Sequence, residues 1–110
     1  MKQQKTMETV YPPLAGNRKE TNAAFYACVS GRVQGVGFRY SAAREAHRLH
    51  INGWVRNASN DDVEVWAEGD PEKLATFLEW LRQGPQFSRI DSVDAVEKHA
   101  KGYYDFNIEY

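Results

Sequence analysis

The segment Gly31–Arg39, with the sequence GRVQGVGFR, brings together groups that can hold a phosphate. Its glycines allow consecutive backbone N–H groups to turn to one side and form a concave anion site. The helix expected after it adds unpaired N–H groups and the positive end of a dipole, and Arg39 adds a planar fork for two phosphate oxygens. The segment therefore predicts a small-phosphate site, although a plain tight turn between a strand and a helix also fits these residues.

The segment does not match the common nucleotide-binding loops. It lacks the G-x-x-x-x-G-K-[ST] of a P-loop, and Gly35-Val36-Gly37 is not followed by the third glycine of a dinucleotide-binding fingerprint.

The formal net charge is −1, but residues 23–62 carry five arginines against three acidic residues, whereas residues 63–110 carry five basic residues against ten acidic ones. An anionic ligand is favoured at the arginine-rich part, where a solvated basic face is the alternative.

Metal and redox chemistry find no support in the sequence. Cys28 is the only cysteine, which excludes intramolecular disulfides, cysteine-rich zinc sites and a C-x-x-C motif. His47 and His50 interrupt the apolar stripe of their expected helix, and no carboxylate or thiol stands at ligand spacing from them. We therefore place both histidines on the surface and expect no metal site.

Seven elements predicted from hydrophobic periodicity must position the candidate site. Strands are expected at residues 24–33, 54–58, 63–68, 92–98 and 106–110, and helices from residue 38 to about residues 50–52 and at residues 71–83. Asp70-Pro71 marks the start of the second helix and Gly84-Pro85 its end. The order β-α-β-β-α-β-β predicts an α+β fold, a split βαβ arrangement with both helices on one face of an antiparallel sheet.

The chain is long enough for one domain. It has 110 residues, of which 42% are hydrophobic and 26% charged, a composition typical of globular proteins. Residues 1–22 are polar and lack periodicity, so we predict a disordered N-terminal tail before a domain at residues 23–110. No apolar run reaches the length of a membrane helix, and the N-terminus lacks a secretory signal. We therefore expect a cytoplasmic protein without a membrane partner.

Two other functions found on this fold are disfavoured. RNA-recognition modules carry aromatic residues in a basic motif on their central strands, whereas the expected strand at residues 63–68 is acidic and holds only Trp66. Metal carriers of this fold need two thiolates in the first loop, which has none. We therefore expect no nucleic-acid partner.

Two motifs resemble the acylphosphatase family. Gly31–Arg39 matches its signature G-x-V-Q-G-V-x-F-R at every fixed position, and Gly53–Asn57 (GWVRN) matches its second signature, Gly-aromatic-small-basic-Asn. The spacing of the two motifs also matches, and the resemblance covers about residues 24–110. It implies a ferredoxin-like α/β sandwich, βαββαβ with an added C-terminal edge strand, in agreement with the periodicity. One departure is Asn60-Asp61, which replaces the usual Asp-Gly in the hairpin after Asn57.

The resemblance implies a monomeric enzyme that hydrolyses carboxyl-phosphate mixed anhydrides to a carboxylate and inorganic phosphate, without a metal or cofactor. Arg39 and Asn57 are the expected catalytic residues: Arg39 would bind the phosphoryl group and Asn57 would orient the attacking water. The backbone N–H groups that complete the phosphate site would be those of Gln34, Gly35, Val36, Gly37 and Phe38. The alternative is a non-catalytic acylphosphatase-like module that binds phosphate compounds for a carbamoyl-transfer partner.

Overall fold

The computed structural model describes residues 22–110, so the predicted disordered tail lies outside the described residues except for Asn22. The elements follow in the order β1 (Ala23–Arg32), α2 (Phe38–Arg48), β2 (Asn52–Asn57), β3 (Val63–Gly69), α3 (Pro71–Gln83), β4 (Arg89–Lys98) and β5 (Phe106–Glu109). This confirms the predicted type and order of the elements. β2 and β4 begin earlier than expected, because Gly53 and Arg89 pair with neighbouring strands through their backbones, which hydrophobic periodicity does not reveal.

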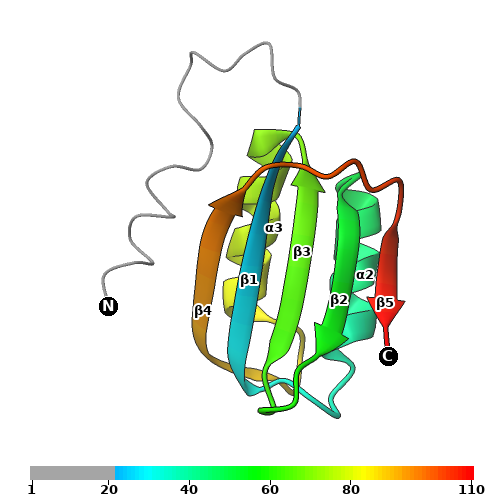
Figure 1. Cartoon of the computed structure of the whole chain (residues 1–110). Helices are drawn as coiled ribbons and strands as arrows, with labels where there is room; N and C mark the ends of the chain where they lie inside the picture. The colour runs from blue at the N-terminus through cyan, green and yellow to red at the C-terminus, as the bar shows by residue number, and fades with distance from the viewer. Residues whose placement is uncertain (1–21) are drawn as a thin grey trace.

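The five strands form one sheet in the order β4-β1-β3-β2-β5, and both helices cover the same face of it (Figure 1). The first four strands pair antiparallel, but β5 runs parallel to β2. The expectation of an antiparallel sheet is therefore wrong for β5. The cause is the connection after β4: residues 99–105 cross one end of the sheet to its opposite edge, and β5 then runs back along that edge (Figure 1).

The strand directions bring distant segments to one end of the sheet. β1 and β2 are both antiparallel to β3, and β5 is parallel to β2. The C-terminal ends of β1, β2 and β5 therefore lie at the same end of the sheet, beside the loop that leads from β1 into α2. This is where the two motifs meet.

The main core lies between the sheet and the helices. Alternate residues of β3 face this core, namely Val63, Val65 and Ala67. One side of α3 is also buried there, through Leu74, Phe77, Leu78 and Leu81. Burying such a face stabilises a helix that is too short to persist alone.

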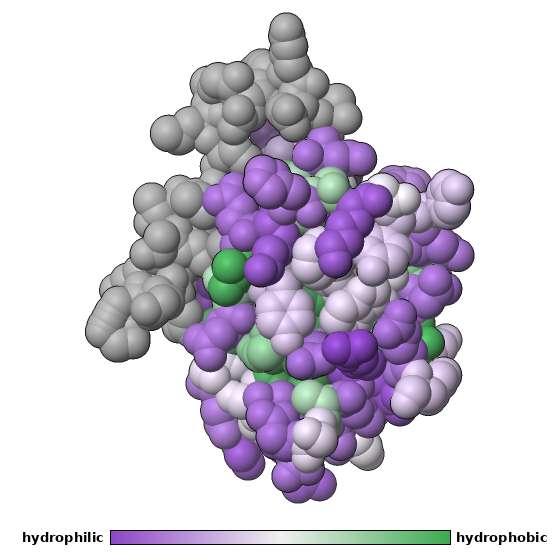
Figure 2. Space-filling view, in the orientation of Figure 1, coloured by the Kyte–Doolittle hydropathy of each residue, from purple (hydrophilic) through white to green (hydrophobic). Residues whose placement is uncertain are grey.

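The opposite face of the sheet carries a smaller apolar cluster of Ala24, Trp54 and Trp66, with Tyr26 packed against it. Figure 2 looks onto this face and shows hydrophilic side chains around a paler central area. Arg56 and Lys101 lie over the rings of Trp54 and Trp66, at 4.5 Å and 4.4 Å from the ring centroids. The aromatic rings are thus covered by charged side chains.

Glu68, at the end of β3, holds the segment that crosses to β5. Its side chain is buried, with 2% of the residue exposed. The carboxylate accepts the backbone N–H groups of Lys101, Gly102 and Tyr103 at 2.6, 3.0 and 3.1 Å and the indole N–H of Trp66 at 2.8 Å. Burial alone would raise the pKa of Glu68, but these four donors outweigh it and lower the pKa. Sequence reasoning did not predict these contacts of Glu68.

Candidate active site

A pocket of about 190 Å³ lies at the end of the sheet where β1, β2 and β5 end and α2 begins. It is lined by Val33, Gly35, Gly37, Phe38, Arg39, Tyr40, Asn57, Ile108 and Tyr110. Five of the seven predicted site residues are therefore brought together. The other two, Gln34 and Val36, do not line the pocket with their side chains.

The loop before α2 has the backbone shape of an anion site. Gly35 and Gly37 take φ angles of 77° and 81°, in the left-handed region that glycine adopts without strain. A Cβ atom at either position would meet nothing within 4 Å. Glycine is therefore required here by conformation rather than by space.

The N-terminus of α2 opens into the pocket as an electropositive end. Gly37 is its N-cap, and the first helical hydrogen bond runs from the Ser41 N–H to the Gly37 carbonyl at 3.0 Å. The N–H groups before Ser41 have no helical acceptor. No acidic residue stands in the first turn and no side chain caps it, so the positive end of the dipole is not neutralised by the helix itself.

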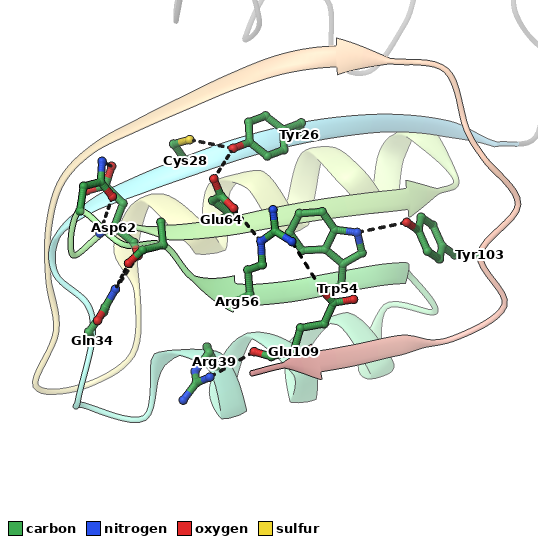
Figure 3. A network of polar contacts seen from close by, with 12 residues as sticks. Tyr26, Cys28, Gln34, Arg39, Trp54, Arg56, Asp62, Glu64, Tyr103 and Glu109 are labelled. Carbon is green, nitrogen blue, oxygen red and sulfur yellow. Dashed lines mark hydrogen bonds and ion pairs between the residues drawn. The ribbon is translucent and has the colours of Figure 1, made fainter.

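Gln34 ties the loop to the β2–β3 hairpin. Its Nε2 donates to the carbonyl of Ala58 at 2.9 Å and to the carbonyl of Asp62 at 2.8 Å (Figure 3). The Asn60-Asp61 turn of this hairpin is also held by a hydrogen bond. Asp61 takes a φ of 75°, and the Asn60 side chain accepts the Asp62 N–H at 3.2 Å. The loop and the end of β2 are therefore held in a fixed relation. Sequence reasoning considered only the backbone of Gln34 and missed this contact.

Arg39, in the first turn of α2, is oriented by β5. Its Nη1 donates to the Glu109 carbonyl at 3.2 Å, and its Cζ lies 4.7 Å from the centroid of the Tyr110 ring. A guanidinium has five N–H donors, so the bond to Glu109 leaves others for an anion in the pocket. Sequence reasoning also missed Ile108 and Tyr110 as pocket residues, because periodicity predicted their strand but not its neighbour.

Asn57 reaches the same pocket from the end of β2, where it is exposed. Among residues 22–110 its side-chain amide makes no hydrogen bond with the protein. An amide carries both a donor and an acceptor, so Asn57 can hold a water in this pocket. The preceding residue, Arg56, points to the opposite face of the sheet.

The described residues offer no metal-binding cluster. Within residues 22–110, no three side chains of the types His, Cys, Asp and Glu gather as ligands would. His47 and His50 are both exposed, as predicted, and the Nε2 of His47 lies 3.0 Å from the Phe106 carbonyl. In the same part of the chain, no helix has the length and apolar character needed to cross a membrane.

Comparison with known proteins finds one family. The family model described as acylphosphatase matches residues 25–108. A protein named acylphosphatase from Thermococcus kodakarensis is 42% identical over 80 residues, which cover 73% of this chain and 88% of the relative. The chain thus spans most of the length of this relative.

Two solved structures have the same fold. The structure of an acylphosphatase from Coxiella burnetii superposes with a TM-score of 0.80 at 34% identity, covering 86% of this chain and all of the other. The crystal structure of full-length HypF, in a phosphate- and nucleotide-bound form, superposes with a TM-score of 0.76 at 30% identity. That match covers 81% of this chain but only 12% of the HypF chain.

Proposed function

This chain belongs to the acylphosphatase family and is a hydrolase, and we propose that its substrate is an acyl phosphate. The reaction would yield a carboxylate and inorganic phosphate, at the pocket described above. One observation carries the proposal. Arg39 and Asn57 come from separate motifs, yet they line one small pocket at the electropositive start of α2. The two groups that the chemistry needs, an anion-binding fork and a water-binding amide, therefore line the same pocket.

The loop and Arg39 bind the phosphoryl group in this proposal. The backbone N–H groups of residues 34–38 and the free N–H groups of Arg39 donate to the phosphoryl oxygens. Gln34 and Val36 contribute only through their backbones, since their side chains lie outside the pocket. In phosphoryl transfer, charge is spread over the three equatorial oxygens, and donors that are already in place stabilise it without reorganisation.

Asn57 orients the attacking water. Its amide oxygen accepts a hydrogen bond from the water and holds the water oxygen in line with the bond between phosphorus and the acyl oxygen. The water oxygen bonds to phosphorus, the acyl oxygen leaves with its electron pair as a carboxylate, and the water proton passes to the phosphate or the solvent. A carboxylate leaves without being protonated, so positioning and preorganised dipoles are sufficient. A neutral amide places no negative charge beside the phosphoryl oxygens. The reaction needs no metal, cofactor or second subunit.

The likeness to a segment of HypF favours a second candidate function. The chain would then be a non-catalytic module that binds phosphate compounds for a carbamoyl-transfer partner. Both functions require the same phosphate site, but only the first requires turnover by the chain alone.

Turnover of acetyl phosphate by the purified chain separates the two functions. We expect hydrolysis, with inorganic phosphate as a competitive inhibitor. Arg39→Lys should lose most of this activity, because a point charge replaces a planar fork. Arg89→Lys is the matched control, because Arg89 is an exposed arginine paired with Asp91 and lies outside the pocket. Turnover that is unchanged in Arg39→Lys would remove Arg39 from the mechanism, and phosphate binding without turnover would favour the second candidate.

A further inference from the structure

We propose that Arg56, the basic residue of the second motif, is a positioning residue that fixes the end of β5 and thereby orients Arg39. This inference rests on the proposed role of Arg39 in phosphate binding. Arg56 itself is not part of the pocket lining. It acts from the other face of the sheet, through Glu109.

Arg56 is held by two neighbours, Glu64 and Trp54. Its Nε donates to Glu64 Oε1 at 2.8 Å, and its guanidinium lies over the Trp54 ring at 4.5 Å. Glu64 is held in turn by the Tyr26 hydroxyl, which donates to Oε2 at 2.8 Å. Figure 3 shows this row of side chains running across β1, β3 and β2. Arg56 therefore offers a fixed positive charge beside β5.

Glu109 is contacted by two arginines from opposite faces of the sheet. Arg56 and Glu109 are partners in the parallel pairing of β2 and β5, and Arg56 Nη1 lies 3.8 Å from Glu109 Oε1. The backbone carbonyl of the same residue accepts Arg39 Nη1 at 3.2 Å. Glu109 thus links Arg56, on the face of the sheet opposite the helices, to Arg39 in the pocket (Figure 3).

β5 is held at its end by backbone pairing with β2, to which the ion pair of Arg56 with Glu109 adds. It has four residues and lies at the edge of the sheet, where it pairs only with β2. Without Arg56, the Glu109 carbonyl and the Tyr110 ring would be free to move away from Arg39. Phosphate binding would then have to order Arg39 and the end of β5 together, which lowers affinity.

The expected effect is modest and falls on binding. Removing one exposed ion pair should weaken phosphate inhibition and raise KM by about two- to fivefold, in line with the measured strength of such pairs. Arg39 contacts the phosphoryl group in both the ground state and the transition state, so its loss of order raises KM more than it lowers kcat. kcat should stay within about twofold, because Asn57 is held by its own strand and by the hairpin.

Arg56 could instead act by attracting the phosphate directly through its charge. The effect of Glu109→Gln on phosphate binding distinguishes this direct role from the positioning role. If Arg56 merely attracted the phosphate through its charge, removing the Glu109 carboxylate would strengthen phosphate binding, because a nearby negative charge is lost. If Arg56 acts through Glu109, the same change would weaken binding. Glu109→Gln keeps the backbone carbonyl and the shape of the side chain, so only the ion pair is tested.

The experiment measures the inhibition constant of inorganic phosphate and the melting temperature for Arg56→Gln, Glu109→Gln and the double variant. Each single variant should raise the inhibition constant about two- to fivefold. The inhibition constant of the double variant should not exceed that of the single variant with the higher value, because both changes remove the same ion pair. Arg89→Gln removes a comparable surface ion pair, with Asp91 at 3.0 Å, and should change nothing.

Three results would overturn the inference: tighter phosphate binding in Glu109→Gln, additive effects in the double variant, or a lower melting temperature with an unchanged inhibition constant. The proposed function fails separately, by phosphate binding without turnover of acetyl phosphate, and the role of Arg39 fails if turnover persists in Arg39→Lys. If that variant is inactive while Arg56→Gln binds phosphate as the parent chain does, only the positioning role of Arg56 is wrong.

Discussion

Glu68→Gln is expected to lower the free energy of unfolding by about 2–4 kcal/mol, although the two side chains have nearly the same shape. Glu68 Oε1 accepts the N–H groups of Gly102 and Tyr103, and Oε2 accepts those of Lys101 and Trp66. Glutamine replaces one of these oxygens by an NH₂ group. In either orientation of the amide, two of the four donors then face another donor.

The magnitude follows from the two donors that lose their acceptor. A buried donor without a partner costs about 1–3 kcal/mol. Residues 101–103 are exposed around the carboxylate, so water can reach the backbone donors and the cost lies in the lower part of that range, about 1–2 kcal/mol each. For a domain of this size, the sum corresponds to a fall in melting temperature of roughly 10–20 °C.

Urea unfolding followed by tryptophan fluorescence at pH 7 measures this difference. Glu97→Gln is the matched control, because Glu97 is an exposed glutamate on β4. The reasoning would be refuted if Glu68→Gln unfolded within about 0.5 kcal/mol of this control, the usual scatter of surface substitutions.

The pH dependence gives a second check on the same carboxylate. Its pKa is lowered from the ordinary value of 4.5, so the ionised form contributes stability that is present above that value and lost as the pH falls through the lowered pKa. The gap between the parent chain and Glu68→Gln should therefore be constant from pH 7 to about pH 5 and narrow on further acidification. A gap that widens in acid would contradict the assignment of the charge to Glu68.

Three further predictions concern the proposed function and the tail. Asn57→Ala should lower kcat by roughly 10²-fold, the usual loss for one preorganised group, while the inhibition constant of phosphate stays within a few-fold. Asn57→Asp should also be slow, because its carboxylate repels the substrate. Steady-state rates should be unchanged in excess EDTA and nearly constant from pH 5 to pH 8, and a bell-shaped profile in that range would reveal an acid–base group. Deleting residues 1–22 should leave the melting temperature and the rate nearly unchanged, since the segment has few apolar groups; a large fall in melting temperature would show that Val10, Tyr11 or Leu14 packs on the domain.

Much of the fold could be predicted from the sequence, because local rules determine its helices and most of its strands. The apolar stripe of α3 and the Asp70 cap mark that helix on their own: the Asp70 side chain accepts the Glu72 N–H at 2.9 Å. The direction of β5 could not be predicted in this way. It depends on where residues 99–105 cross the sheet, and that segment has no periodicity of its own.

The candidate site divides in a similar manner. Gly35, Gly37 and Arg39 could be found because a strand, a glycine-spaced loop and a helix start follow one another directly in the chain. Tyr110 could not, since it reaches Arg39 only through the pairing of β5 with β2. Arg56 is intermediate: it directly opposes Glu64 in the β2–β3 hairpin, so the ion pair of these two residues follows once the register is known.

The hydrogen bonds of Gln34, Arg39 and Glu68 that sequence reasoning missed share one physical feature, which is that one partner is a backbone group. Gln34 binds the carbonyls of the hairpin, Arg39 binds the carbonyl of Glu109, and Glu68 binds the N–H groups of residues 101–103. Backbone donors and acceptors are the same at nearly every position, so residue types cannot indicate which of them a side chain will meet. These contacts join the phosphate loop, the hairpin that carries Asn57 and the strand that orients Arg39. The motifs therefore identify the groups proposed for the chemistry, whereas the precision with which they are placed depends on contacts that only the three-dimensional structure reveals.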